Sequence, residues 1–312
     1  MENLTYNSMI LQLEGLKVSE QSMYPVFLFF LIFYVIILVT NIGIFVLIAV
    51  HRSLHEPMYI LFCNLPFNDV LGNSIMIPRL LVDILRPSSE RSISYVECAI
   101  QAFCSHTYGT TSHTILMIMA FDRYVAICDP LRYTTIMTNK MVIALSASAW
   151  GVAIFFISIL LGLTYRLNRC RTFISNPFCD NVTLFKLSCE DVSVNNLYGL
   201  IFTVLLFVSS MGSIALTYIK ITAVCLSTKS KTLNSRALKT CSTHLAVYLI
   251  MLMSGFIIIL LHRFPAYADY RKISALLFHI VPSILNPLIY GLQCTEIRHV
   301  LIQVLCSKKV RP

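Results

Sequence analysis

The chain has 312 residues, of which 57% are hydrophobic and only 12% are charged, and its mean hydropathy is +0.75. A soluble domain typically carries about 25% charged residues, so this composition excludes an ordinary soluble protein. The net charge of +9 is spread over short segments and forms no compact basic domain. We therefore expect the positive charge to contact lipid headgroups and a cytoplasmic partner rather than nucleic acid.

Seven stretches of the chain are apolar over the roughly 20 residues that a helix needs to cross a bilayer. In chain order they are Pro25–Val50, Met58–Leu85, Cys98–Tyr124, Met141–Tyr165, Asn195–Leu226, Ala237–His262 and Ile273–Leu292. The sequence thus predicts an all-α membrane protein with a seven-transmembrane helix bundle at 25–292. We expect residues 1–24 to form an extracellular tail, and residues 293–312 a cytoplasmic tail with a short amphipathic helix.

The orientation with the N-terminus outside is favoured by three features. More lysines and arginines then flank the inner ends of the spans, as the positive-inside rule requires. The glycosylation sequons at Asn3 and Asn181 fall outside. Four of the eleven cysteines also fall outside: Cys98, Cys170, Cys179 and Cys189. An even number of cysteines on the oxidising side allows two disulfides in three connectivities.

Three polar residues lie within apolar spans: Asn41 in the first, Asp69 in the second and Asn286 in the seventh. A carboxylate at membrane depth normally faces the bundle interior and has polar partners, so we expect these residues to share one network. The network can be a static contact between helices or can rearrange when the bundle changes conformation. We favour the second interpretation, because Pro287 interrupts the helical hydrogen bonds and lets the seventh span kink.

The third span is unusually polar. Spacings of three and four place five of its residues on roughly one helix face: Ala102, Ser105, His106, Gly109 and His113. Two histidines on one face can indicate a metal site, but no compact set of carboxylates or cysteines accompanies them. Structural hydrogen bonding explains them better, and a pocket wall with a polar group explains them best. We expect neither a metal nor a cofactor.

Arg263 stands at the outer end of the sixth span. Two interpretations are open. Its side chain can reach to the lipid headgroups, or it can cap a cavity in the bundle and bind a carboxylate through two hydrogen bonds.

The string "MAFDRYVAICDPLRY" at the inner end of the third span resembles the signature of the olfactory receptors, which are rhodopsin-like G-protein-coupled receptors. Phe121 replaces a tyrosine of that signature. The segments "LHEPMY", "RALKTCSTHL" and "PSILNPLIYGL" resemble, in order and spacing, the family's first inner loop, its entry to helix six and its helix seven. The resemblance spans nearly the whole chain.

This resemblance implies roles for particular residues. Asp122 holds Arg123 at rest and releases it to contact a G protein, and Tyr124, Tyr218 and Tyr290 take part in coupling or activation. The outer cysteines pair as Cys98–Cys179 and Cys170–Cys189.

His106 and the segment His262–Phe264 resemble the class I or fish-like branch, which is associated with water-soluble odorants including carboxylic acids. The implied ligand is a small odorant, with a carboxylic acid favoured, in the outer half of the bundle. The implied ligand contacts are Ala102, Ser105, His106, Gly109, Thr110 and Arg263. The resemblance also implies coupling to a heterotrimeric G protein of the stimulatory olfactory type. It places the chain among the lipids of the plasma membrane, at sensory-neuron cilia.

Some positions depart from the family pattern. Pro66 replaces a serine in the second span, and Met251 and Leu252 replace the aromatic pair of helix six, which puts that activation switch in doubt. A related receptor with a non-olfactory role is the main alternative. A transporter is disfavoured because we find no inverted repeat and no pair of broken helices. An enzyme is disfavoured because no catalytic motif is present.

Overall fold

A computed structural model describes residues 6–227, 231–262, 264, 267–293 and 295–307, with only the backbone described for some residues of the last three helices. The helices are α1 (Glu20–Val50), α2 (Pro57–Phe62), α3 (Asn64–Leu85), α4 (Tyr95–Cys128), α5 (Tyr133–Ile136), α6 (Asn139–Tyr165), α7 (Asn181–Phe185), α8 (Ser193–Ser227), α9 (Lys231–His262), α10 (Ala268–Gln293) and α11 (Thr295–Ser307). The strands are β1 (Ile10–Leu13), β2 (Ser92–Ser94) and β3 (Phe173–Ile174), and two 3₁₀ turns cover Arg52–Leu54 and Ser88–Glu90.

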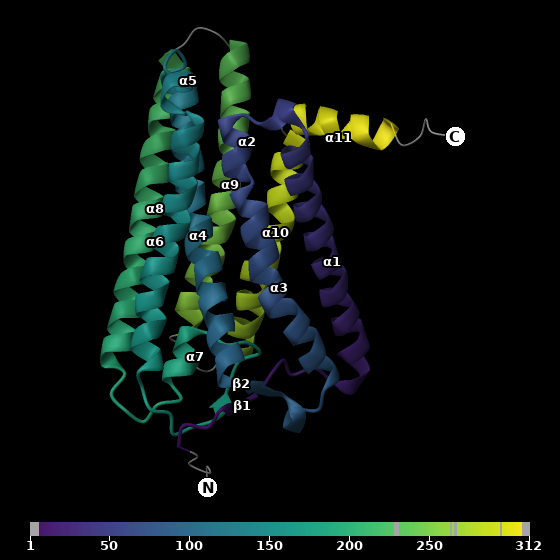
Figure 1. Ribbon diagram of the computed structural model, residues 1–312, viewed down its shortest axis with the longest axis vertical. Helices are drawn as coiled ribbons and strands as arrows, with labels where there is room; N and C mark the ends of the chain where they lie inside the picture. The colour runs from purple at the N-terminus through teal and green to yellow at the C-terminus, as the bar shows by residue number, and fades with distance from the viewer. Residues whose placement is uncertain (1–5, 228–230, 263, 265–266, 294, 308–312) are drawn as a thin grey trace.

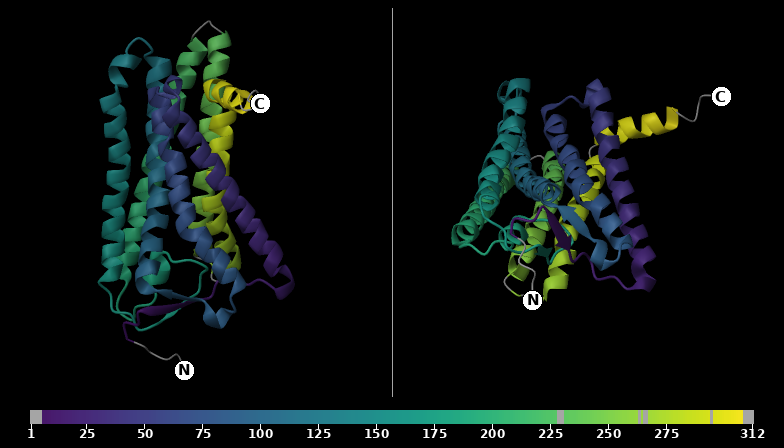
Figure 2. Two further views of the ribbon diagram at one scale, coloured as in Figure 1. Left: turned by 45° about the vertical axis from the view of Figure 1, so that its right-hand side comes forward. Right: turned by 60° about the horizontal axis from the view of Figure 1, so that its bottom comes forward.

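The long helices lie side by side in an elongated bundle (Figure 1). We call the end with the three strands and α7 the N-terminal face, and the end with α5 and α11 the C-terminal face. The helix α11 projects sideways from the C-terminal face (Figures 1 and 2), as expected for the short helix after the last span. It buries Ile297 and Val300 and exposes Arg298 and His299, so it is amphipathic.

Six helical segments in the described part of the chain are long and apolar enough to cross a membrane: α1, α2 with α3, α6, α8, α9 and α10. In α8 only 11% of the most apolar stretch is buried inside the protein, so its apolar side chains face outward, where lipid would cover them. The polar α4 packs against α3, α6, α8 and α9 and therefore lies inside the bundle. The predicted all-α membrane bundle is confirmed, and α4 is polar because its neighbours shield it from lipid.

The second span, predicted as one helix from Met58 to Leu85, is divided in the structure. The helix α2 ends at Phe62 and α3 begins at Asn64. Pro66 lies four residues after Phe62 and has no N–H to donate to the Phe62 carbonyl, while its ring crowds that carbonyl. The residue that departs from the family pattern therefore lies where the helix is interrupted.

The N-terminal segment is more ordered than a polar tail would be. Strand β1 is the centre of a three-stranded sheet, antiparallel to β2 and parallel to β3. Gln12 pairs with Ser92 on one side and with Phe173 on the other. The alternation of exposed and buried residues in β1 places Leu11 and Leu13 beneath the sheet, in contact with the bundle core.

Candidate functional site

A cavity of about 200 Å³ lies between α4, α8, α9 and α10 in the half of the bundle nearer the N-terminal face. Its walls are largely apolar, with Phe202, Phe207, Ile258 and Phe278 among the lining residues. Gly109 faces Phe278 across this space, and a Cβ atom at that position would lie 3.5 Å from the Phe278 ring, in ordinary contact. An apolar cavity with a few polar groups is the usual form of a small-molecule site.

Four of the six expected ligand contacts lie on the cavity wall: Ser105, His106, Gly109 and Thr110. His113, one further turn along the same face of α4, also lines it. Ala102 does not line the cavity, because it lies one turn nearer the N-terminal face and is buried in the core beneath the sheet. Arg263 lies outside the described residues.

The protonation of two cavity histidines follows from their hydrogen bonds. The backbone N–H of Asn181 donates to His106 Nε2 over 3.1 Å, so the His106 proton resides on Nδ1. His279 Nδ1 lies 3.0 Å from the Ala275 carbonyl oxygen and must donate to it, so in the neutral ring His279 Nε2 accepts from the Ser105 hydroxyl over 3.1 Å. The neutral form of each ring is therefore an acceptor at Nε2.

Two cations that the sequence analysis did not single out, Arg271 and Lys272, also line the cavity. Lys272 Nζ lies 2.7 Å from Glu14 Oε2 and 3.4 Å from Asp269 Oδ1, so its charge is balanced. Arg271 donates from Nη2 to Asn176 Oδ1 over 3.1 Å. The Arg271 side chain is 91% buried, and its Nε has no hydrogen-bond partner among the described residues. Arg271 is therefore a buried cation with a donor to spare.

The neighbouring acid Asp180 is held by other groups. One of its carboxylate oxygens accepts from the backbone N–H of Thr183 over 2.7 Å, and the other accepts from Asn176 Nδ2 over 3.1 Å. Asp180 thus caps the N-terminus of α7. Asn176 connects it to Arg271 without a direct ion pair in the described part of the chain.

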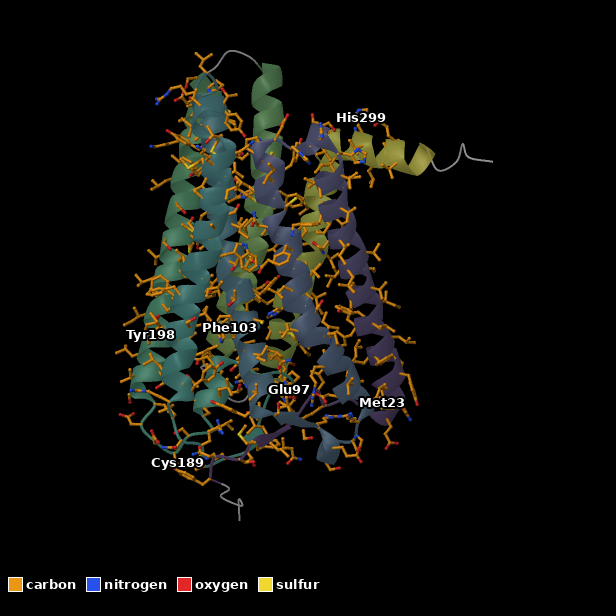
Figure 3. All side chains as sticks on the ribbon, in the orientation of Figure 1. Met23, Glu97, Phe103, Cys189, Tyr198 and His299 are labelled. Atoms are coloured by element: carbon orange, nitrogen blue, oxygen red, sulfur yellow. A yellow bond between two sulfur atoms is a disulfide. The ribbon has the colours of Figure 1, made fainter. Side chains whose placement is uncertain are left out.

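The chain that lines the cavity on the side of the N-terminal face is tied down by disulfides. Cys98 is bonded to Cys179, and Cys170 to Cys189. A capping box formed by Ser94 and Glu97 starts α4 immediately before Cys98, which fixes where the first bridge meets that helix. Figure 3 shows Cys189 and Glu97 at this face, opposite His299.

Polar residues expected to share a network in the middle of the bundle are brought together around Ser283. Asn286 Nδ2 donates to Asp69 Oδ2 over 2.9 Å, and the Ser283 hydroxyl donates to Asp69 Oδ1 over 2.9 Å. Asn41 Nδ2 donates to the Ser283 carbonyl over 2.9 Å, so among the described residues Asn41 is connected to Asp69 through Ser283. Asn73 Nδ2 also reaches the Ser283 hydroxyl, over 2.8 Å. Sequence reasoning missed Ser283 and Asn73, since serine and asparagine on an apolar helix carry little signal alone.

At the C-terminal face, Arg123 donates to the buried Asp122 carboxylate through Nε, over 3.0 Å, and through Nη2. The other Asp122 oxygen accepts from the Tyr133 hydroxyl over 2.9 Å. Burial, reinforced by the Asp122 carboxylate, raises the pKa of the Tyr133 hydroxyl, which therefore stays protonated and donates this bond. Asp122 consequently holds one group on its own helix and one on α5.

Nearby, the Tyr218 hydroxyl of α8 is hydrogen-bonded to His244 Nδ1 of α9. Lys220 Nζ lies 5.6 Å from the centre of the Tyr124 ring, within cation–π range. Tyr290 lies in α10, but its side chain is outside the described part of the structure. The structure therefore gathers Asp122, Arg123, Tyr124 and Tyr218 at one face, far from the cavity.

Comparison with known proteins decides the family. The sequence profile of the family described as "Olfactory receptor" matches residues 30–308. The chain belongs to the olfactory receptor family. It is 33% identical to olfactory receptor 1496 of Rattus norvegicus over 99% of both chains. It is 32% identical to human olfactory receptor 52D1 over 94% of this chain and 93% of that one, and 34% identical to human olfactory receptor 5AC1 over 88% and 89%.

Membership in the olfactory receptor family makes this chain an odorant-type G-protein-coupled receptor. It is a multi-pass protein of the plasma membrane, and it is not an enzyme.

Of the two predicted glycosylation sites of this olfactory receptor, the structure describes one. Asn3 lies outside the described residues. The Asn181 side chain is only 3% exposed, and its Oδ1 accepts from the Thr164 hydroxyl over 2.7 Å. The burial of Asn181 argues against a glycan there.

The spacing of residues in the sequence could also have identified the face of α10 that lines the cavity. Arg271, Ala275, Phe278 and His279 line the cavity and recur at spacings of three and four residues. The same periodicity that pointed to α4 could therefore have pointed to α10. The spacing alone does not say which face of the helix turns inward.

Proposed function

We propose that this receptor binds a small, water-soluble odorant, with a carboxylic acid favoured, in the cavity between α4, α8, α9 and α10. Binding activates a stimulatory olfactory-type G protein at the C-terminal face, which lies on the cytoplasmic side. The observation that carries this proposal is Arg271, a buried cation on the cavity wall with a donor to spare.

The preference for a carboxylate follows from the charges around the cavity. Lys272 is balanced by Glu14 and Asp269, and Asp180 is occupied as a helix cap. A ligand carboxylate near Arg271 would give the buried guanidinium a partner of opposite charge. The family resemblance favours Arg263 as the cation that contacts the ligand, so Arg263 is tested together with Arg271.

The signal would pass along α4. This helix carries Ser105, His106 and Gly109 at the cavity and Asp122 with Arg123 at the C-terminal face. A ligand that contacts α4 differently in two bundle arrangements shifts the population between them. Release of Arg123 from Asp122 in one arrangement would then expose the guanidinium to the G protein. No chemical reaction is needed.

The test is a cyclic-AMP dose–response for a series of short carboxylic acids and their amides in cells expressing the receptor. Arg271→Gln should raise the half-maximal concentration of an active acid about tenfold to a hundredfold, because a hydrogen bond to a charged group contributes about 1.5–3 kcal/mol. Response to the matching amide should change much less.

Two further variants sharpen this test. Arg263→Gln measures the other candidate cation, and Arg166→Gln, an exposed arginine at the end of α6, serves as the matched control and should change nothing. If acids and amides act equally on the wild type, or if neither Arg271→Gln nor Arg263→Gln affects the acid, the carboxylate proposal is wrong.

A further inference from the structure

A second cavity, of about 470 Å³, adjoins the first on the side of α6, α7 and α8. The helix α6 contacts both α7 and α8, and α7 lies at the N-terminal face (Figure 1). The two cavities share five wall residues, which come from α4, α7, α8 and α9: His106, Val182, Phe202, Thr203 and Ile259. These side chains therefore form the boundary between the two cavities.

The second cavity reaches the protein surface at its other end. Lys186 and Asn196 line it and are both exposed. Lys186 directly follows α7, and Asn196 lies in the first turn of α8, so we call this end the mouth. From Asn196 to Thr203 the wall follows two turns of α8, or roughly 10 Å. The cavity therefore runs from exposed polar side chains at the N-terminal face to the boundary with the first cavity.

The mouth of the second cavity carries positive charge. Lys186 forms no ion pair within the described part of the chain, and the Arg171 guanidinium lies beside it, with Nη1 3.4 Å from the Lys186 carbonyl oxygen. Two acids of the same loop, Glu190 and Asp191, accept hydrogen bonds from other residues of the loop. A positive mouth raises the local concentration of anions and speeds their entry.

The boundary between the cavities offers an anion a hydrogen-bond donor. His106 Nε2 accepts from the backbone N–H of Asn181 at the start of α7, so the His106 proton is on Nδ1. This Nδ1–H has no hydrogen-bond partner among the described residues, yet it is not fully enclosed by protein. An anion that crosses from the second cavity to the first can therefore accept a hydrogen bond on the way.

We propose that the second cavity is the route by which a carboxylate odorant enters from the extracellular water, and that Lys186 gathers anions at its mouth. The route ends in the first cavity, where Arg271 is the buried cation. This inference rests on the proposed function for the chemical class of the odorant. Its test uses neither an odorant nor a G protein, so the route and the carboxylate site can fail separately.

The experiment measures how fast small charged reagents reach the first cavity from outside the cell. Ala275 lines only the first cavity, and Ala275→Cys supplies a reporter thiol there. Intact cells that express the receptor are treated with a methanethiosulfonate carrying either a sulfonate or a trimethylammonium group. Both reagents are charged and cross membranes poorly. Mass spectrometry of the purified receptor gives the rate of modification, and the chain without the reporter gives the background from native cysteines.

The charge at the mouth is tested in the reporter background. Lys186→Gln should slow the anionic reagent about twofold to fivefold and speed the cationic one by a similar factor, the effect of one unit charge at close range in water. Both changes should shrink at roughly 1 M salt, where the Debye length is about 3 Å. Lys186→Arg keeps the charge and should keep the original rates. Arg86→Gln removes an exposed cation at the end of α3 and should change neither rate.

Unchanged rates in Lys186→Gln would overturn the proposal. Entry from the lipid, past the exposed apolar side chain of Leu200 on the same wall, would give this result, because it does not depend on the charge at the mouth.

Gly199→Leu tests the route itself. A Cβ atom at Gly199 would lie 3.6 Å from Leu160 Cδ1, which is ordinary contact, so the leucine side chain should fill the second cavity without a clash at the backbone. Both reagents should be slowed by the same factor, since a steric block does not depend on charge. Gly212→Leu makes the same change on the same helix with open space around it, and should leave both rates unchanged.

A Gly199→Leu receptor that reaches the cell surface and keeps both rates would show that the reagents enter the first cavity by another opening, and the proposal would be wrong. If this variant does not reach the surface, the comparison of Lys186→Gln with Lys186→Arg decides. Loss of the acid preference in the odorant test with these rates as expected would refute the carboxylate site and leave the route standing.

Discussion

The two ends of the bundle are held together by different kinds of interaction. At the N-terminal face, two disulfides, a three-stranded sheet and the capping boxes of α4 and α7 fix the chain around the cavity. At the C-terminal face, Asp122 holds Arg123 and Tyr133, and Tyr218 bonds to His244. Covalent bonds and backbone ladders keep one arrangement, while side-chain hydrogen bonds can exchange partners. The contrast suggests a preformed ligand site at one end and a switch at the other.

The largest expected effect lies at the N-terminal face. Replacing Cys98 and Cys179 by serine opens a bridge between residues 81 apart, which the chain-entropy model values at about 4.5 kcal/mol. The Cys170–Cys189 bridge spans 19 residues and is valued at about 3 kcal/mol. Thermal unfolding of both double variants should show the greater loss for the first pair. Equal losses would mean that loop closure does not set the stability of this face.

At the opposite face, Arg123→Ala should reduce signalling at least about tenfold while ligand binding is retained. The guanidinium would be missing when the G protein docks, and a charge-assisted hydrogen bond contributes about 1.5–3 kcal/mol, or roughly tenfold or more in the coupled population. Cyclic-AMP production and ligand binding are measured on the same cells. Full activation by the variant at normal surface level would contradict this role for Arg123.

Between the two ends, Ser283→Ala should weaken the connection across the middle of the bundle. It removes the hydroxyl that donates to Asp69 and accepts from Asn73, and it leaves those buried groups short of partners. We expect a loss of about 1–3 kcal/mol of stability, measured by thermal unfolding. The control is Ser158→Ala, an exposed serine that bonds only within α6. An equal loss of stability in the two variants would show that the Ser283 hydroxyl does not connect the helices in the middle of the bundle.

The smallest effect is expected from Tyr133→Phe, which removes one of the two groups held by Asp122. Loss of one hydrogen bond, about 0.5–1.5 kcal/mol, should loosen the resting arrangement and raise ligand-independent cyclic AMP by up to about tenfold. As a control, Tyr267→Phe, at an exposed tyrosine near the N-terminal face, should leave the ligand-independent cyclic AMP level unchanged. A lower basal signal in Tyr133→Phe would mean that Tyr133 supports the active arrangement instead.

The sequence by itself determined the six strongly apolar spans and the family to which the chain belongs. Hydropathy over about 20 residues is a local property, and the Asp122–Tyr124 motif lies within one continuous string, so neither depends on how helices pack. The sequence also identified Ser105, His106 and Gly109, which line the cavity. Their spacing places them on one face of α4, and spacing within one helix is again a local property.

Only the tertiary structure decided which residues from different helices meet. Ser283 joins Asn41 to Asp69, Arg271 reaches the cavity wall, and Asn181 is buried, because each helix has a particular rotation and tilt against its neighbours. Side chains on a helix recur every 3.6 residues whichever way the helix turns. Spacing therefore identifies a face, and only packing against the other helices selects where that face points.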